Sequence, residues 1–204
     1  KKTINHVEIR KILPVQDGYR MPGEYEPHRG CILIWPERPG SWRNGAREAK
    51  KAFADVIRAI AKSEEVYLAA SGKTFSEAEK LAQRLQTDEA LYPIRVFTAE
   101  TDDAWARDVG PTFVTDGKEV RGINWSFNAW GGTYDGLYQD WQKDDNVAEE
   151  FCKQTGYDYY DAAPFVLEGG SIHVDGEGTL LTTEECLLSP GPLSYTHLRA
   201  HETS

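Results

Sequence analysis

The alternation of apolar, strand-like runs with helix-like segments is the feature that most restricts the fold of this chain. The continuous apolar run at residues 31–35 ends at Pro36 and is typical of a strand buried on both faces. The next segment places these apolar residues on one face at helical spacing: Ala49, Phe53, Val56, Ile57 and Ile60. Strand-like runs at 65–70 and 92–97 then enclose a second, more polar helix at 76–85. This alternation predicts an α/β fold.

Two hairpins are predicted in the second half of the chain. The first pairs residues 112–114 with 120–125 across an Asp-Gly turn, and the second pairs 171–174 with 179–182. Their opening sequences, Gly-Pro-Thr-Phe-Val and Gly-Ser-Ile-His-Val, lie 60 residues apart, with a predicted helix and strand between them. A repeat of this size is typical of propeller-like or quasi-symmetric α/β folds, while chance similarity of two hairpins is the alternative.

The charge balance restricts the partners of the chain. Its 23 basic and 33 acidic residues give a net charge of −10, which argues against a nucleic-acid partner because such proteins need a basic face. The acidic balance fits a cationic substrate, although most acidic proteins are acidic merely for solubility. No apolar run approaches the ~18 to 20 residues that span a bilayer, and the N-terminus lacks the apolar region of a signal peptide. We therefore expect a soluble protein without a membrane partner.

The cysteines indicate the compartment. Cys31, Cys152 and Cys186 are odd in number, far apart and without CxxC spacing, which predicts reduced thiols in the cytoplasm. None lies in an evidently electropositive setting that would activate a thiolate. The sequence also contains no HExxH motif, no Cys/His cluster and no phosphate loop, so we expect neither a metal nor another cofactor.

The densest charged segment is Asp-Asp-Ala-Trp-Ala-Arg-Asp at residues 102–108. Carboxylates beside an aromatic ring suit a planar cation, because the acid accepts two N–H bonds while the ring packs against the cation or its alkyl stem. The alternative is a solvated acidic loop in which Arg107 pairs with a neighbouring aspartate.

A second candidate segment places Glu168 before Gly169 and Gly170 at the start of the last hairpin. Paired glycines permit unusual backbone angles or the close approach of a ligand, and an ordinary hairpin entry is the alternative. His173 and Asp175 have the composition of a general-base dyad. However, residues two apart on a strand need not touch, and aspartate at the start of a glycine turn favours local hydrogen bonds.

Five motifs follow one another in order: Met-Pro-Gly-Glu-Tyr-Glu-Pro-His at 21–28, Trp-Ala-Arg-Asp-Val-Gly-Pro-Thr at 105–112, Phe-Asn-Ala-Trp-Gly-Gly at 127–132, Leu-Glu-Gly-Gly-Ser-Ile-His-Val-Asp-Gly-Glu-Gly-Thr at 167–179 and Thr-Thr-Glu-Glu-Cys-Leu-Leu at 182–188. Together they resemble agmatine deiminase from about Arg20 to Pro190. The parent superfamily, the guanidino-group-modifying enzymes, has a five-unit pentein-type α/β propeller. The resemblance therefore implies a partial propeller of about half that fold, which would explain the 60-residue spacing of the hairpins.

The resemblance also implies an activity, namely hydrolysis of agmatine to N-carbamoylputrescine and ammonia without metal or organic cofactor. In the family a cysteine thiolate attacks the guanidinium carbon, a histidine shuttles protons, and carboxylates grip the guanidinium. Carried over by motif, Asp108 would be one such carboxylate, Glu168 the second, and Trp105 would line the substrate channel. Trp130 and His173 would at most line the pocket. A homo-oligomeric parent is left open.

Two family motifs are missing from this sequence. The catalytic histidine of the family lies in Gly-His-x-Asp and its nucleophile in a late Gly-Asn-x-His-Cys, and neither motif occurs here. Cys186 is therefore not the nucleophile, and it lies in a strand-like segment. Residues 193–204 resemble a translated sequencing-library adapter. We therefore expect residues 1–192 to be a truncated agmatine deiminase domain, inactive alone, followed by a non-native tail at 193–204.

Two other interpretations of the sequence remain. The parent could be a relative of the bacterial peptidylarginine deiminases, although the aromatic, glycine-rich loop at 127–138 favours the small-molecule enzyme. The chain could also be a naturally short, non-catalytic binding domain.

Overall fold

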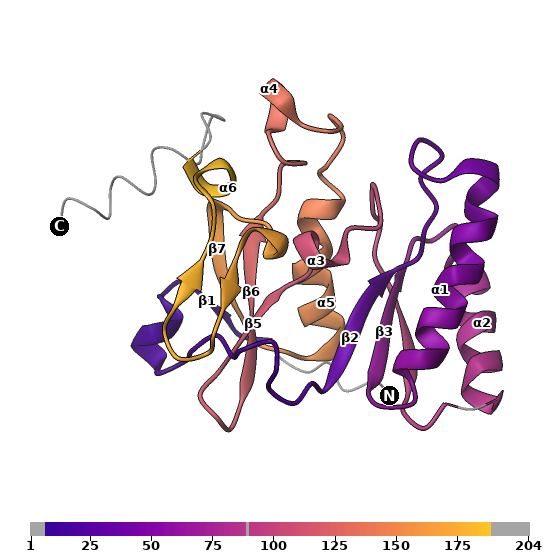
Figure 1. The fold of residues 1–204 in the computed structure, drawn as a ribbon, viewed down its shortest axis with the longest axis horizontal. Coiled ribbons are helices and arrows are strands. Elements are labelled where there is room, and N and C mark those ends of the chain that lie inside the picture. Colours follow the sequence, from indigo (N-terminus) through magenta and orange to yellow (C-terminus); the bar gives the residue numbers. More distant parts are fainter. Residues whose placement is uncertain (1–6, 89, 189–204) are drawn as a thin grey trace. The chain divides into compact units, whose positions relative to one another are not determined.

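The computed structural model describes residues 7–88 and 90–188, and its backbone divides into two compact units. One unit combines the N-terminal segment up to Glu26 with the chain from Arg107 onward, and the other is Pro27–Ala106 (Figure 1). We call these the discontinuous unit and the continuous unit. The predicted tail at 193–204, and with it the predicted boundary at residue 192, lies outside the described residues.

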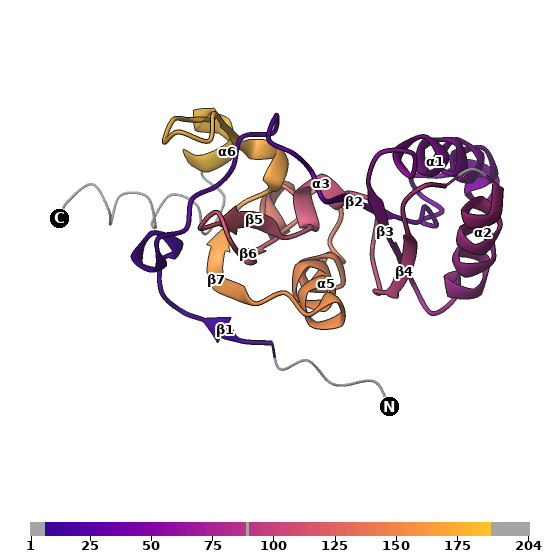
Figure 2. The same ribbon diagram turned by 90° about the horizontal axis from the view of Figure 1, so that it is seen from below.

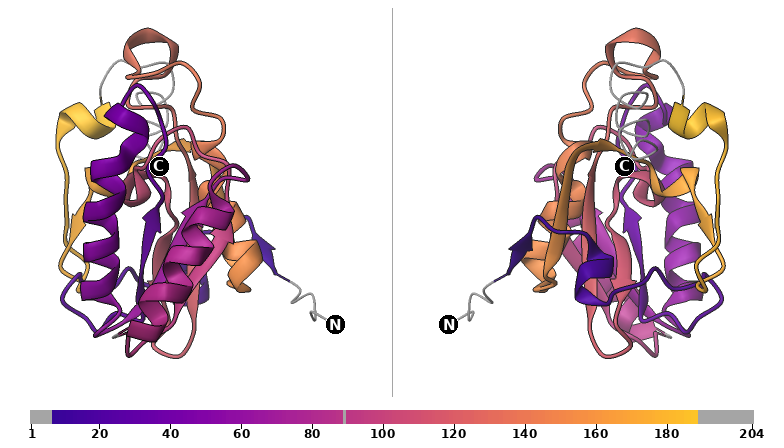
Figure 3. Two further views of the ribbon diagram at one scale, coloured as in Figure 1. Left: turned by 90° about the vertical axis from the view of Figure 1, so that its right-hand side faces the viewer. Right: turned by 90° about the vertical axis from the view of Figure 1, so that its left-hand side faces the viewer.

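The continuous unit is a three-stranded parallel sheet with two crossover helices, in the strand order β2-β3-β4. Its elements are β2 (Gly30–Ile34), α1 (Arg47–Ile60), β3 (Glu65–Ala70), α2 (Phe75–Asp88) and β4 (Ile94–Thr98). Parallel neighbours need a long crossover, and each helix provides one. Both helices lie on the same face of this sheet (Figure 2, Figure 3). The predicted alternation of strands and helices is confirmed here.

The core of the continuous unit lies between this sheet and its helices. Ile57 of α1 and Leu85 of α2 are buried against Val66 and Leu68 of β3. Val56, which the helical pattern placed on the inner face, is 45% exposed, so this assignment was wrong. Because successive helical residues are about 100° apart, Val56 points away once Ile57 faces the sheet.

The discontinuous unit contains a four-stranded mixed sheet in the order β1-β7-β6-β5. Its elements are β1 (Ile9–Arg10), β5 (Thr112–Thr115), β6 (Val120–Ser126), α5 (Val147–Thr155) and β7 (Tyr159–Val166). β5 and β6 form the predicted antiparallel hairpin, and α5 leads from β6 to its parallel neighbour β7. Gly156 ends α5 with φ of 82°, the left-handed conformation expected of a glycine C-cap.

A second hairpin follows the mixed sheet. It pairs β8 (His173–Val174) with β9 (Leu180–Leu181), so both sequences that lie 60 residues apart open antiparallel hairpins. Short helical turns occupy segments expected to be loops: α3 (Ala106–Val109) and α4 (Gly132–Asp135). Cys186 lies in a helix, α6 (Glu184–Leu188), so its assignment to a strand-like segment was wrong.

Four short 3-10 turns complete the described structure: η1 (Pro14–Asp17), η2 (Arg43–Ala46), η3 (Asp144–Asn146) and η4 (Gly169–Ser171). Asp17, at the end of η1, accepts hydrogen bonds from Arg10, Arg121 and Tyr160 at 2.7, 2.9 and 2.8 Å. This network ties the N-terminal segment to the mixed sheet. Within residues 7–88 and 90–188, none of the helices is long and apolar enough to cross a membrane.

Candidate functional site

Asp108 marks a point in the discontinuous unit where two distant segments meet. It lies in α3, half-buried, and its Oδ1 accepts a hydrogen bond from the Gly170 backbone N–H at 3.0 Å. Within the described residues, Oδ2 accepts none. Oδ1 therefore holds Asp108, the first predicted acid, in place, and Oδ2 remains available for a donor.

The two glycines at the entry of the last hairpin permit this approach. A Cβ at Gly169 would collide with the backbone carbonyl oxygen of Arg107, and one at Gly170 would lie 2.5 Å from Oδ1 of Asp108. The segment that approaches these glycines closely is α3 of the same chain, whereas the sequence suggested a ligand, and the approach of a ligand stays a prediction. A larger residue at Gly169 would push apart the segments that carry Asp108 and Glu168, whereas one at Gly170 would displace the carboxylate of Asp108.

Glu168, the second predicted acid, directly precedes these glycines and is only 6% exposed. The Ser171 hydroxyl donates to its Oε2 at 2.7 Å, and the Ser171 N–H donates to its backbone oxygen at 2.9 Å. Oε1 accepts no hydrogen bond from the part of the chain that the structure describes. Since Gly170 binds Asp108, the two carboxylates come from segments in direct contact.

The electrostatics around Asp108 disfavour its charged form. Burial raises the pKa of this carboxyl above its ordinary value, while the Gly170 N–H and the charge of Arg107 lower it in part. A carboxylate in this setting gains stability when a cation approaches it. A planar cation with several N–H donors would supply both a positive charge and partners for the oxygens of the two acids.

Arg107, beside Asp108 in α3, is paired with Glu24 from the N-terminal motif. Its Nη1 and Nη2 donate to Oε1 and Oε2 of Glu24 at 2.7 and 3.3 Å. Asp102 and Asp103 lie instead in the continuous unit and are 9% and 4% exposed. The alternative of a solvated acidic loop is therefore wrong for these two residues.

Both buried aspartates have partners in the continuous unit. The carboxylate of Asp103 accepts hydrogen bonds from the Ser41 hydroxyl and from the Ala104 N–H. The backbone oxygen of Asp102 accepts a hydrogen bond from Arg38 at 3.0 Å. These contacts give Asp102 and Asp103 structural roles that composition did not reveal.

The loop at residues 20–26 clasps the last hairpin. Arg20 donates to both carboxylate oxygens of Glu26 at 2.7 and 2.9 Å and to the backbone oxygen of Gly176 at 3.2 Å. The Tyr25 hydroxyl donates to the backbone oxygen of Asp175 at 2.6 Å. Gly176 has φ of 77°, and a Cβ there would lie 2.6 Å from the Gly23 nitrogen. Through Glu24 the same loop reaches Arg107, so it braces both sides of the candidate site.

The sequence of this loop does not show what it contacts, because an irregular segment has no periodicity. Its only signal was the motif at 21–28. The arginine lowers the pKa of Glu26 to about 2, with a further contribution from the Gly23 N–H. The clasp is therefore ionic over the neutral pH range.

In the predicted dyad of His173 and Asp175, the aspartate has a structural role in the turn of the hairpin. The carboxylate of Asp175 accepts the N–H groups of Glu177 and Thr179 at 2.8 and 3.0 Å, which closes the turn of the hairpin. Hydrogen bonds from Thr179 and Glu177 lower the pKa of Asp175. His173 is exposed on β8, opposite Leu181 of β9. Its role at a pocket wall stays a prediction.

The two tryptophans singled out from the sequence lie in different units. Trp130 of the discontinuous unit packs edge-on against Phe127 and Tyr138, with ring centroids 5.1 and 6.3 Å apart. It has φ of 62° and follows Ala129 at 57°, a strained backbone that often accompanies functional loops. Trp105 belongs to the continuous unit, is 40% exposed, and precedes Asp108 by three residues in the chain.

Cys152 lacks the features of an activated nucleophile, and Cys186 lies in a different setting. Cys152 is fully buried in α5, where burial raises the pKa of its thiol to about 12. Cys186 is exposed in α6, and its sulfur accepts a hydrogen bond from the Thr183 hydroxyl at 3.2 Å. Over residues 7–88 and 90–188, no group of three or more His, Cys, Asp or Glu side chains is arranged to hold a metal ion.

Comparison with known proteins places these features in a family. Residues 20–193 match the family described as Porphyromonas-type peptidyl-arginine deiminase. The chain belongs to this family. Relatives within it include "Putative agmatine deiminase 1" of Listeria monocytogenes, 56% identical over 177 residues, which are 86% of this chain and 46% of that protein. A Selenomonas ruminantium protein, "Putative agmatine deiminase", is 50% identical over 184 residues, or 90% of this chain and 48% of its own.

Solved structures agree with this membership of the peptidyl-arginine deiminase family. The agmatine deiminase of Enterococcus faecalis is 44% identical with a TM-score of 0.81, and the match covers 94% of this chain and 52% of that one. A Porphyromonas gingivalis structure titled as a putative arginine deiminase is 25% identical with a TM-score of 0.67, covering 85% and 49% of the two chains. This chain thus spans about half the length of the relatives it matches.

Proposed function

We propose that this chain is the guanidinium-holding part of an agmatine deiminase, in which Asp108 and Glu168 accept hydrogen bonds from the guanidinium of agmatine. The observation that carries the proposal is the contact between the two acid-bearing segments through Gly170. Oδ2 of Asp108 and Oε1 of Glu168 accept no hydrogen bond from the described residues. The names of the more similar relatives support agmatine as the substrate.

The physical chemistry of the two acids suits this substrate. A guanidinium is a planar cation with a fork of N–H donors that matches carboxylate oxygens. Burying it without an opposite charge would be very unfavourable, and a single buried carboxylate would leave most of its donors unpaired. Burial raises the pKa of Asp108, and a guanidinium in contact with it would lower that pKa again. The cation would therefore offset the cost of holding a charged carboxylate in a half-buried position.

In the proposed reaction a cysteine thiolate attacks the guanidinium carbon and ammonia leaves, after which water releases N-carbamoylputrescine. The two carboxylates hold the cation in place for this attack and disperse its charge. The motifs expected to carry the thiolate and the proton-shuttling histidine do not occur in this sequence. We therefore propose that the chain binds agmatine but releases no ammonia by itself.

The fold of the whole enzyme is part of the proposal. We propose that this chain forms about half of a five-unit α/β propeller of the pentein type. The hairpins β5–β6 and β8–β9, whose opening sequences at Gly110 and Gly170 lie 60 residues apart, support a repeat. We place the enzyme in the cytoplasm, in keeping with the three free cysteines of the chain.

A peptidyl-arginine substrate is the second candidate, since the family is described by that activity. Several proteins named as agmatine deiminases are 44 to 56% identical to this chain, which favours the small molecule. Two structures named as arginine or peptidyl-arginine deiminases are 25 and 26% identical, and a C. jejuni agmatine deiminase is 23% identical. Citrulline formation on an arginine peptide by the longer protein, without turnover of agmatine, would reverse this choice.

Calorimetric titration of the chain with agmatine tests the proposal. We expect binding by the unsubstituted chain and a loss of affinity of about tenfold or more in Asp108→Asn and in Glu168→Gln, because each removes a charge-assisted contact worth roughly 1.5–3 kcal/mol. Glu185→Gln, which neutralises an exposed acid of the same unit, is the matched control and should bind normally. Putrescine, which has no guanidinium, should not bind. Equal affinity of the chain for putrescine and agmatine would contradict the assignment of Asp108 and Glu168 to the guanidinium.

A further inference from the structure

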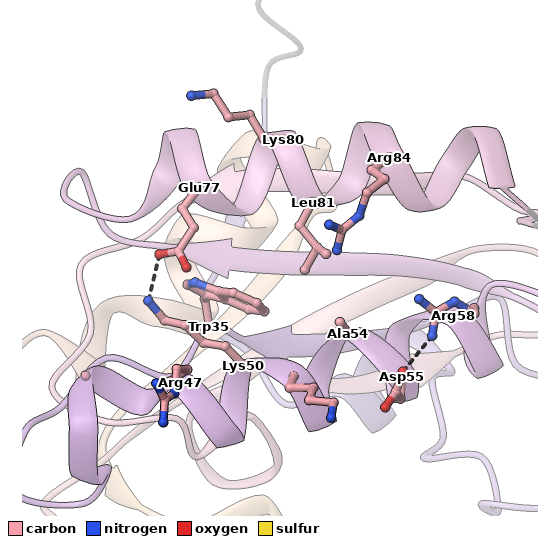
Figure 4. Close-up of a pocket in the computed structure, with 12 residues that line it drawn as sticks. Trp35, Arg47, Lys50, Ala54, Asp55, Arg58, Glu77, Lys80, Leu81 and Arg84 are labelled. Atoms are coloured by element: carbon pink, nitrogen blue, oxygen red, sulfur yellow. Dashed lines mark hydrogen bonds and ion pairs between the residues drawn. The ribbon is translucent and has the colours of Figure 1, made fainter.

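A groove runs between α1 and α2 on the continuous unit, whereas Asp108 and Glu168 belong to the discontinuous unit. The volume of the groove is about 810 Å³ (Figure 4). Ala54 of α1, Leu81 of α2 and Trp35, which follows β2, form the apolar part of its lining. The volume falls within the roughly 300–1,000 Å³ range of small-molecule sites.

The charged residues of the groove are mostly basic. Six cationic side chains line it: Arg47, Lys50, Lys51, Arg58, Lys80 and Arg84. Only Asp55 and Glu77 are acidic. In a chain with a net charge of −10, this is a local concentration of positive charge opposite in sign to the whole molecule. Such a patch attracts anions and raises their local concentration.

The acids of the groove neutralise only part of this charge. Glu77 of α2 pairs with Lys50 of α1 at 2.6 Å, and Asp55 pairs with Arg58 at 2.6 Å. Lys51, Lys80 and Arg84 form no ion pair with any described residue. Figure 4 shows Arg84 reaching from α2 into the space above α1, whereas Lys80 points away from it. Arg84 is thus the cation best placed to meet a ligand.

A buried donor lies at the base of the groove. Trp35 is 3% exposed, and its indole Nε1 has no hydrogen-bond acceptor among the described residues. The Nζ of Lys50 stands 5.7 Å from the centre of the same ring. Buried N–H groups without an acceptor are uncommon in folded proteins. Because this nitrogen has almost no exposed surface, a ligand in the groove would reach it only after neighbouring side chains move.

We propose that this groove binds a small anion with two or more phosphate groups. Arginine donors match phosphate oxygens in a bidentate manner, and cations on both helices can hold two phosphate groups at once. An extended nucleic acid is disfavoured because the acidic remainder of the chain repels a long polyanion. The site lies within the continuous unit and is independent of the acids proposed for agmatine.

Titration of the whole chain with inorganic pyrophosphate, compared with orthophosphate, tests this proposal. We expect pyrophosphate to bind at least tenfold more tightly. Arg84→Gln should weaken it by about tenfold, whereas Glu77→Gln should strengthen it by releasing Lys50 from its ion pair. Lys73→Gln removes one positive charge from an exposed residue of the same unit outside the groove, and it should leave binding unchanged.

The opposite effects expected for Arg84→Gln and Glu77→Gln distinguish loss of a contact from misfolding, because a damaged fold would weaken binding in both variants. Absence of binding by the unsubstituted chain would overturn the proposal. So would equal losses in Arg84→Gln and Lys73→Gln, or no gain in Glu77→Gln. Tighter binding of a glutamate-rich peptide than of pyrophosphate would also overturn it and would make the groove a protein-docking surface.

Discussion

At the scale of single residues, Gly169 and Gly170 control the contact between α3 and the segment of Glu168. They differ in what an added methyl group would meet. At Gly169 it would collide with the rigid backbone carbonyl of Arg107, whereas at Gly170 it would meet the movable carboxylate of Asp108. Gly169 is therefore needed for the stability of the fold, and Gly170 determines the position of the Asp108 carboxylate.

Alanine substitution should separate these two effects. We expect Gly169→Ala to lower the free energy of unfolding by about 1–3 kcal/mol, as for other overpacked sites. Gly170→Ala should change stability less and reduce agmatine affinity, because Asp108 must move. Gly40→Ala is the control, since its Cβ would lie 3.8 Å from the nearest atom, Nε of Arg38. Denaturant unfolding and agmatine titration measure the two quantities. Identical profiles for both site variants would refute the distinction.

At the scale of elements, the clasp of residues 20–26 on the turn of the β8–β9 hairpin depends on ionisation. The pKa of Glu26 is lowered from 4.5 to about 2 by Arg20 and by the Gly23 N–H. A lowered carboxyl pKa means that the folded state holds the charged form more strongly than the unfolded state does. Its stabilising contribution is therefore complete above about pH 4.5 and is lost as the pH falls toward 2.

Thermal unfolding across pH 2 to 7 checks this clasp. Glu26→Gln should lower the melting temperature at pH 7 and flatten its fall between pH 4.5 and pH 2, because the group that takes up the proton is gone. Arg20→Gln should have a similar effect. In the double variant the two losses should not add, since both substitutions break the same pair. Additive losses would show that the pair does not act as a unit.

The elements also show how far sequence patterns reach. Strands and helices with strong periodicity were predicted within a few residues, as for β3, α1 and the two hairpins. Single-turn elements such as α3 and α4 are too short to produce a period. The short strand β1 exists only through its pairing with β7, a partner about 150 residues away.

The candidate site shows the same limit. Residue types indicated that the acidic run at 102–108 suits a cation, and the family motifs singled out Asp108 and Glu168. That Gly170 joins their segments depends on a contact between residues 62 positions apart. Burial likewise separates Asp102 and Asp103 from Asp108, although all three lie in one acidic run. A one-dimensional pattern cannot distinguish an acid with a structural partner from one left for a ligand.

At the scale of the whole molecule, we propose that this chain is the substrate-binding half of an agmatine deiminase. The chain spans about half the length of its relatives, while both proposed guanidinium ligands lie within it. Binding and chemistry would then be divided along the sequence, with the acids in this part and the attacking thiolate elsewhere. Such a division predicts that agmatine binding persists without turnover.

The pKa of Asp108, followed by NMR through its side-chain carboxyl carbon, tests this account most directly. In the free chain we expect a pKa above the ordinary value of 3.8, because burial disfavours the charge. Saturating agmatine should lower it, since the guanidinium favours the carboxylate, and putrescine should not. A pKa of Asp108 that stays the same when agmatine binds would contradict the claim that this carboxylate holds the guanidinium.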